Sequence, residues 1–362
     1  MDNKYSSVHY SSYLGLDKIL NAQELRSSAL GETAHDEMLF IIIHQVYELW
    51  FKQIGWEIDS IIEMFKTDSV DETNIGTAIA RLNRVTEIEQ VLIDQIRVLE
   101  TMTSLDFLDF RNYLIPASGF QSFQFRVVEI KLGLRNQNRL TYNQKVFSSV
   151  FSEEQQELIQ NLEKEPSLFD LIEKWLERTP FLDFEDFNFK EQYLKAVDKM
   201  TKTEKEAIEA TTFISEEDKG IRIKMLLETQ KYIENSMDED YHNSQIAEGT
   251  IRLSYKASMG ALLINLYRDQ PILRNPFNLL TKITDVDEMF TMWRHRHAQM
   301  VLRMLGKKMG TGGSSGHGYL KQTTDQHHIY RDLHNISTLL IPRSELPELP
   351  AKLREKLGFS YK

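Results

Sequence analysis

The chain has 362 residues and no cysteine. This absence excludes disulfide bonds, thiolate nucleophiles, iron–sulfur clusters and haem held through cysteine. Any metal must therefore be held by histidine, aspartate, glutamate, methionine or tyrosine. Long apolar runs are also missing, since the longest stretch, Met38–Ile43, is far too short to cross a bilayer. The polar residues 1–16 contain no apolar signal core, so a cytoplasmic protein is expected.

The chain has fewer positively charged than negatively charged side chains. Lys and Arg total 43 against 54 for Asp and Glu, which gives a net charge of −11. A diffuse acidic surface keeps a protein soluble and disfavours unspecific binding to nucleic acid or anionic lipid, so neither a nucleic acid nor a membrane is expected as a partner. Hydrophobic residues make up 41% of the chain, which is enough for a sizeable core.

Proline and glycine are scarce, with 8 and 16 residues respectively. Apolar residues recur at helical spacing almost everywhere, and no alternating runs bounded by turn residues indicate strands. The sequence therefore predicts an all-α fold. Helices are expected over 35–65, 74–103, 120–134, 221–237, 245–268, 279–305 and 327–340, with a possible interruption near Thr284–Asp285.

Residues 138–216 differ from the rest. Their helical segments are shorter, Pro166 and Pro180 interrupt them, and acidic residues are dense. No flexible linker borders the segment. We therefore expect a single helical domain over residues 1–362, in which 138–216 form a small inserted helical lobe. An irregular part of the same domain is the alternative.

Two histidines lie on strongly periodic segments. His44 has Phe40 and Tyr47 among its helical neighbours, a pattern that a hydrogen-bonded core histidine explains most simply. His297 has Trp293 among its apolar neighbours, whereas His295 has a more polar set, so His297 is expected to face the interior. A neutral imidazole in a dry apolar pocket suits an axial haem ligand. A buried structural histidine is the commoner outcome of so short a pattern.

Other metal and phosphate sites have weaker support. A paired-carboxylate iron site needs two Glu-x-x-His pairs, and 325–328 offers only one near match. A zinc site at His327, His328 and His334 is conceivable, although adjacent histidines are more often solvated. The glycine-rich segment Gly310–Gly316 lacks the residues of a phosphate loop. It either lets the backbone approach a ligand or simply connects two helices.

Arg111 lies between Phe107 and Leu114 on a short predicted helix. A guanidinium group in an apolar pocket can bind a carboxylate through two parallel hydrogen bonds. An ion pair with Asp106 or Asp109, or exposure at the surface, is the more common explanation for such a residue.

Four segments carry a family resemblance: HDEMLFIIIHQVYELWFKQI, LDFLDFRNYLIPASGFQSFQFR, WRHRHAQMVLRMLGKKMGTGGSSG and NISTLLIPR. In this order and spacing, from Tyr10 to Arg343, the chain resembles the tryptophan 2,3-dioxygenase family. The resemblance implies an all-helical homotetramer with haem b, whose iron is iron(II) in the active form. It also implies insertion of both atoms of dioxygen across the C2–C3 bond of the indole of L-tryptophan. The product would be N-formyl-L-kynurenine, in the first step of tryptophan degradation by the kynurenine pathway.

The resemblance also implies residue roles. His297 matches the proximal ligand of the haem iron, with Trp293 beside it, and His44 matches the distal histidine that meets the indole N–H. Arg111 matches the clamp on the substrate carboxylate, and Thr311 matches the residue that closes on the ammonium and carboxylate side. The remaining matches are to the walls of the indole and haem pocket, Phe40, Phe107, Leu114 and Ser118. An N-terminal segment is implied to reach a neighbouring subunit's site through Tyr10, Tyr13 and Leu14. His295, His327 and His328 gain no ligand role.

Two other classes of protein share parts of this pattern. A haem-binding sensor or oxygen carrier would need the same axial histidine, but it would not need the amino-acid clamp of Arg111 and the Thr311 loop. A helical interaction module would bind no haem. A haem spectrum and an assay for N-formylkynurenine separate the three.

Overall fold

The computed structural model describes residues 7–140, 147–306, 308 and 316–359. Its N-terminal α-helices are α1 (Tyr10–Leu14), α2 (Leu16–Leu20), α3 (Arg26–Leu30), α4 (Glu37–Phe65), α5 (Glu72–Leu99), α6 (Ser104–Arg111) and α7 (Phe123–Leu132). The next are α8 (Glu153–Lys164), α9 (Leu168–Glu177), α10 (Phe189–Ala210), α11 (Glu216–Ser236), α12 (Glu239–Ala247) and α13 (Tyr255–Leu266). The last are α14 (Pro271–Leu305), α15 (Gly316–Gln326), α16 (Arg331–Asn335) and α17 (Ala351–Leu357).

Short elements join these helices. Six single-turn 3₁₀ helices are η1 (Asn112–Leu114), η2 (Gly119–Gln121), η3 (Asn136–Asn138), η4 (Phe147–Val150), η5 (Ile336–Leu339) and η6 (Arg343–Glu345). An antiparallel pair of two-residue strands, β1 (Asp183–Phe184) and β2 (Phe187–Asn188), is the one sheet in the described part of the chain. The all-α prediction is confirmed, with this small hairpin as an addition.

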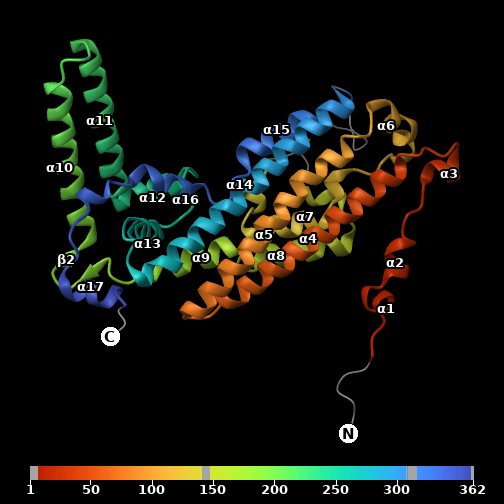
Figure 1. Cartoon of the computed structure of the whole chain (residues 1–362), viewed down its shortest axis with the longest axis horizontal. Coiled ribbons are helices and arrows are strands. Elements are labelled where there is room, and N and C mark those ends of the chain that lie inside the picture. Colours follow the sequence, from red (N-terminus) through yellow and green to blue (C-terminus); the bar gives the residue numbers. More distant parts are fainter. Residues whose placement is uncertain (1–6, 141–146, 307, 309–315, 360–362) are drawn as a thin grey trace, which may run out of the picture.

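The body of the molecule is a bundle of long helices (Figure 1). Helix α5 packs between α4 and α14, α7 packs on α4, and α15 lies along α14. Their facing sides bury apolar residues completely, among them Ile54, Ile58, Leu82, Leu92 and Phe290. Burying such apolar stripes is what stabilises a helical bundle, so the helical periodicity read from the sequence also fixes which faces meet.

The starts of the long helices follow from local chemistry. The Asp71 carboxylate accepts the Asn74 N–H at 2.8 Å and caps α5. Thr103 and Asp106 form a capping box at α6. Pro271 is at the first position of α14, where its missing N–H costs nothing. These caps fix where three of the helices that line the cavity described below begin.

Helices α10 and α11 pack against each other as a hairpin that stands apart from the bundle (Figure 1). By contrast, α8 packs on α7, and α9 packs on α4 and α13. Residues 138–216 therefore hold two helices that contact the body and one arm of the hairpin. A lobe with these boundaries stays a prediction. Among the described residues, no helix is long and apolar enough to span a membrane.

Two helix predictions near the C-terminus are wrong. A single helix over 245–268 was expected, but α12 ends before Gly249, whose φ is +76°, and Ser254 then caps α13 by accepting the Ala257 N–H. A helix over 327–340 was also expected. The Asp287 carboxylate instead accepts the N–H groups of Ile329 and Tyr330 at 3.0 Å, so the chain is not helical there and α16 begins only at Arg331.

Helix α14 is longer than predicted. It begins at Pro271 and continues without a break through Thr284–Asp285, where an interruption was considered. The Thr284 hydroxyl donates to the carbonyl of Thr281 at 2.7 Å, so this β-branched polar residue is satisfied within the helix. Helix α15 was not predicted, because its sequence lacks a strong apolar stripe.

Candidate active site

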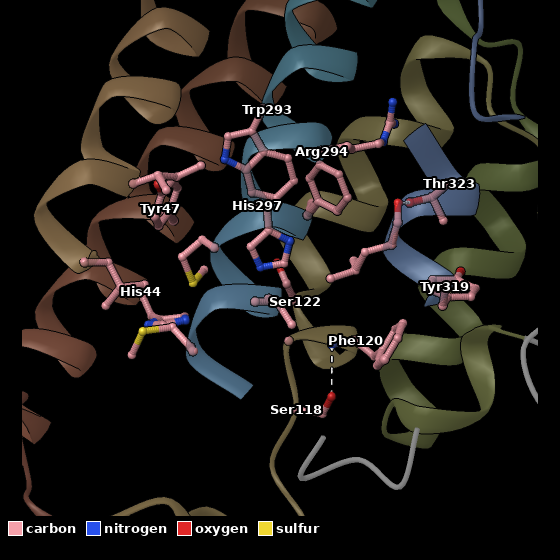
Figure 2. A pocket seen from close by; sticks show the side chains of 18 of the residues that line it. His44, Tyr47, Ser118, Phe120, Ser122, Trp293, Arg294, His297, Tyr319 and Thr323 are labelled. Carbon is pink, nitrogen blue, oxygen red and sulfur yellow. Dashed lines mark hydrogen bonds between the residues drawn. The ribbon is translucent and has the colours of Figure 1, made fainter. Parts of the chain in front are cut away.

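A cavity of about 270 Å³ lies among α4, α5, α6, α7, α14 and α15 (Figure 2). Its walls are mostly apolar and aromatic, with a few polar groups, which is the usual character of a small-molecule site. The site residues predicted from the sequence that line it are Phe40, His44, Phe107, Arg111, Ser118, Trp293 and His297. Segments far apart in the sequence thus meet at one cavity.

His44 extends from α4 into the cavity. Its Nδ1 lies 2.6 Å from the carbonyl oxygen of Phe40, one helical turn earlier, and its ring is 4.1 Å from the Phe40 ring. A carbonyl can only accept, so Nδ1 carries the proton and Nε2 keeps its lone pair. Enclosure by protein around the cavity lowers the pKa of His44, and the bond to Phe40 only partly opposes this effect.

His297 extends from α14 beside Trp293. The two rings are stacked, with 5.3 Å between their centroids and 4° between their planes. Desolvation, with a smaller effect from His44, lowers the pKa of His297 to about 4. The imidazole is therefore neutral near neutral pH and able to act as a nitrogen ligand. His295 is exposed, as the sequence predicts.

Arg111 and two phenylalanines line another part of the cavity wall. Helix α6 presents Phe107 and Arg111 one turn apart, and the Phe40 ring stacks on Phe107 at 5.7 Å. The Asp106 carboxylate accepts the Thr103 N–H and caps this helix. A cation beside apolar rings can hold the carboxylate of an aromatic amino acid while the rings contact its side chain.

Several predicted site residues lie elsewhere. Leu114 is half-buried against the core and is not among the residues that line the cavity. Tyr10, Tyr13 and Leu14 are on α1, with exposed fractions of 72%, 78% and 40%. Helix α1 lies away from the bundle (Figure 1). Thr311 and the glycine-rich segment before Gly316 lie outside the described residues.

Some polar residues on the cavity wall were not assigned to the site from the sequence. The Ser122 hydroxyl donates to the Glu48 carboxylate at 2.6 Å, and burial raises the pKa of Glu48. The Tyr47 hydroxyl donates to the carbonyl of Leu92 at 2.8 Å. Helical spacing could have identified Glu48, because it follows His44 by one turn of α4.

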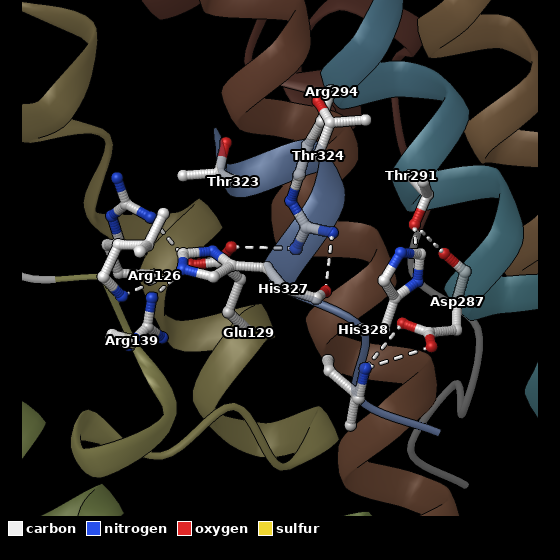
Figure 3. A network of polar contacts seen from close by, with 12 residues as sticks. Arg126, Glu129, Arg139, Asp287, Thr291, Arg294, Thr323, Thr324, His327 and His328 are labelled. Carbon is white, nitrogen blue, oxygen red and sulfur yellow. Dashed lines mark hydrogen bonds and ion pairs between the residues drawn. The ribbon is translucent and has the colours of Figure 1, made fainter. Parts of the chain in front are cut away.

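A buried ionic cluster lies at the same cavity (Figure 3). The Glu129 carboxylate, which is 1% exposed, contacts Arg126 at 2.8 Å, Arg139 at 2.6 Å and Arg294 at 2.9 Å. The three arginines hold the pKa of Glu129 well below its usual range despite its burial. Arg294 lies one turn from His297 on α14, a spacing that could have identified it.

His327 corrects an expectation. Adjacent histidines were read as more often solvated, yet His327 is 1% exposed and lines the cavity. It directly follows α15, where its N–H still donates to the Thr323 carbonyl, and it precedes the residues that Asp287 holds. No group of three or more metal-ligating His, Cys, Asp or Glu residues is found among the described residues, so the iron and zinc alternatives gain no support there.

Comparisons with known proteins agree with this geometry. The family model for tryptophan 2,3-dioxygenase matches residues 1–340. The chain belongs to this family. A tryptophan 2,3-dioxygenase of Bdellovibrio bacteriovorus is 51% identical, over 99% of this chain and 100% of the relative. One of Dictyostelium discoideum is 47% identical, over 98% of this chain and 89% of the relative. A tryptophan 2,3-dioxygenase B of Danio rerio is 46% identical, over 94% and 84% of the two chains.

The cavity fits the haem on which this family depends. His297 supplies a neutral imidazole, Phe40 and Trp293 supply apolar walls, and the buried arginines supply positive charge. These three features would suit the iron, the apolar ring and the anionic side chains of a haem.

Proposed function

We propose that the chain opens the indole ring of L-tryptophan with dioxygen and gives N-formyl-L-kynurenine, using haem b bound in the cavity. Both atoms of dioxygen enter the product across the C2–C3 bond of the indole. This is the first step of tryptophan degradation by the kynurenine pathway. The observation that carries the proposal is that His44, Arg111 and His297, from three different helices, line one cavity.

His297 is proposed as the residue that would hold the haem iron. Its lowered pKa keeps the imidazole neutral, and the parallel Trp293 ring restricts its rotation. When bound, the haem supplies the activation of dioxygen, in its iron(II) form, that no side chain of this chain can supply. The chain's own residues bind the substrate, orient it and keep water away from it.

His44 is proposed to hold the indole end of the substrate. Because Nδ1–H is committed to the Phe40 carbonyl, Nε2 is the acceptor available for the indole N–H. A histidine with a lowered pKa is a weak base, so its role is to position the substrate by a hydrogen bond. Phe40 and Phe107 provide the walls on which the indole packs.

Arg111 is proposed to hold the other end of the substrate by binding its carboxylate. Thr311 is proposed to close on the ammonium and carboxylate side, and Ser118 to form part of the pocket wall. Fixing both ends of the substrate orients it for the reaction. In a well-ordered complex, such orientation lowers the activation barrier by roughly several kcal/mol. A sensor or an oxygen carrier would have no use for such a clamp.

The assembly is proposed to be a homotetramer of single-domain subunits, each with a small helical lobe over 138–216, and to be cytoplasmic. Each subunit's Tyr10, Tyr13 and Leu14 would contact a neighbour's substrate pocket. The exposure of these side chains on their own chain supports this role, because apolar and aromatic surface of this kind is typical of an interface.

Two measurements test the proposal. The purified protein should show the absorption spectrum of haem with an axial imidazole, and the reduced protein should convert L-tryptophan and dioxygen to N-formylkynurenine. Haem without turnover would favour a sensor or carrier. A protein that neither contains haem nor takes it up would favour a helical interaction module and would refute the proposal.

A further inference from the structure

The ionic cluster has more positive than negative charge. Arg126, Arg139 and Arg294 are 9%, 9% and 3% exposed, and the ion pairs described for all three go to the carboxylate of Glu129. Glu163 acts on Arg139 electrostatically from α8, but without such a pair. Near Arg294, burial raises the pKa of Glu89 well above its ordinary value, and neither oxygen of this carboxyl has a hydrogen-bond partner among the described residues. Two positive charges are therefore left without a contacting counter-charge. Buried charges are normally paired, because an unpaired one is strongly destabilising.

His327 adds an unpaired donor to this cluster. Its Nε2 lies 3.2 Å from the Leu140 nitrogen and accepts that N–H, so the proton of the neutral ring must be on Nδ1. Nδ1 is buried and has no hydrogen-bond partner among the described residues. The Nε and Nη2 groups of Arg139 are also buried, with no acceptor in the part of the chain that the structure describes. Buried donors nearly always have partners, so this set of groups indicates an absent acceptor.

Four members of the cluster line the cavity that His297 faces, and Arg139 is not among its lining residues. Arg126, Glu129, Arg294 and His327 all line it. In Figure 2, Tyr319 and Thr323 of the adjoining α15 lie on the other side of His297 from His44. The substrate carboxylate is assigned to Arg111, so the cluster is available to a different anion.

We propose that this cluster binds the two carboxylate side chains of the haem, and that His327 donates its Nδ1–H to one of them. The inference rests on the proposed function, since it needs haem in the cavity. Two carboxylates match the two uncompensated charges, whereas tryptophan brings only one carboxylate together with an ammonium group. Glu129 holds the three guanidinium groups together and offsets only one of their three charges.

Haem dimethyl ester provides the test, because esterification removes both negative charges and leaves the ring and iron unchanged. The haem-free protein is reconstituted with haem or with the diester, and release of each to apomyoglobin is timed. We expect the wild type to retain haem at least about tenfold longer than the diester, as charge-assisted hydrogen bonds of this kind require. Equal retention would overturn the proposal, since the anion of the cluster would not come from the haem.

Variants of His327 test its own role through the ratio of the two lifetimes. We expect His327→Phe to reduce the preference for haem over the diester by about threefold to tenfold. His327→Gln, which keeps an N–H donor, should restore part of it. His328→Phe is the matched control and should keep the wild-type ratio, because His328 lies beside Thr291.

The ratio separates recognition from a structural defect. If His327→Phe shortens both lifetimes equally, His327 supports the fold only and its assignment as a donor is overturned. If neither porphyrin binds with the spectrum of an axial imidazole, both this inference and the proposed function are overturned. If both porphyrins bind without preference, the proposed function survives and this inference alone fails.

Discussion

The indole ring of Trp293 lies parallel to the imidazole ring of His297, with 4° between the planes and 5.3 Å between the centroids. Trp293 is itself held by an edge-on contact with Phe51, at 5.7 Å and 87°, and by Phe125 at 5.0 Å. Aromatic packing around Trp293 thus fixes the orientation of His297, the proposed iron ligand. A ligand held in one orientation loses little conformational entropy when a metal binds.

Replacing Trp293 tests this packing. We expect Trp293→Leu to fold and bind haem but to release it about twofold to tenfold faster, since an aromatic pair contributes about 0.5–1.5 kcal/mol beyond burial. Haem transfer to apomyoglobin measures the rate. Met292→Leu, at a 51% exposed neighbour, is the control and should behave like the wild type. An unchanged rate in Trp293→Leu would show that the stacking does not support the ligand.

The two histidines of α14 should differ sharply. His297→Ala is expected to give a folded helical protein with little haem, or with haem whose spectrum lacks an axial imidazole. His295→Ala should keep its haem, because His295 is exposed while His297 lines the cavity. Absorption spectra of the two purified variants decide the matter. The reverse pair of phenotypes would rule out His297 as the ligand.

Steady-state kinetics should separate His44 from Arg111. His44→Ala should bind haem and lose only part of its rate, because a positioning hydrogen bond contributes about 0.5–1.5 kcal/mol. Arg111→Leu leaves the substrate carboxylate opposite an apolar group, and its apparent affinity should fall by about 2–5 kcal/mol. A normal KM in Arg111→Leu would exclude the clamp, whatever the effect on kcat.

Helices can be predicted well from the sequence where a long apolar stripe packs against another helix. Helix α4 begins two residues after the expected position and ends at Phe65 as expected, because its stripe is buried along its whole length. The segment at 327–340 shows the limit. Its backbone is set by Asp287, a residue about forty positions earlier, and no local pattern reports that contact.

The same distinction holds for the candidate site. His44, Arg111 and His297 were recognised because each lies within a long motif, and they line one cavity. The Glu129 cluster was not recognised, because its members come from three separate segments and only the fold brings them together. A lone arginine in an apolar helix is equally compatible with surface exposure until its partner is known.

His327 should contribute to a loss of folding stability at low pH. Burial lowers the pKa of His327 to about 3 in the folded protein, whereas the unfolded value is 6.5. Between these pH values the unfolded chain binds a proton that the native chain does not, so the free energy of unfolding falls as the pH falls. Well below the unfolded pKa, this contribution falls by about 1.4 kcal/mol for each pH unit. Urea unfolding across this range should therefore give a flatter profile for His327→Gln. His295→Gln should keep the wild-type slope, and a parallel profile for His327→Gln would contradict the prediction.

The last prediction concerns the N-terminal segment. Helix α1 buries none of its own residues, and Tyr10 and Tyr13 are among the most exposed aromatic side chains of the chain. A tail left in solvent would be expected to be polar, so this aromatic surface indicates a partner. If that partner is a neighbouring subunit's pocket, deleting residues 1–14 should keep the haem on His297 but remove most tryptophan turnover. Light scattering on the intact protein should give the mass of a tetramer.

Complementation distinguishes a shared site from a loss of stability. The truncated chain has an intact Arg111 and lacks the tail, whereas Arg111→Leu has the tail and lacks the clamp. In mixed tetramers, some sites combine the tail of one chain with the pocket of the other, so activity should return although neither parent is active. Subunits must be exchanged or refolded together for this to occur, and the unmixed variants treated in the same way are the controls. A truncated chain that is fully active as a monomer would refute the shared site, because each pocket would then be complete within one chain.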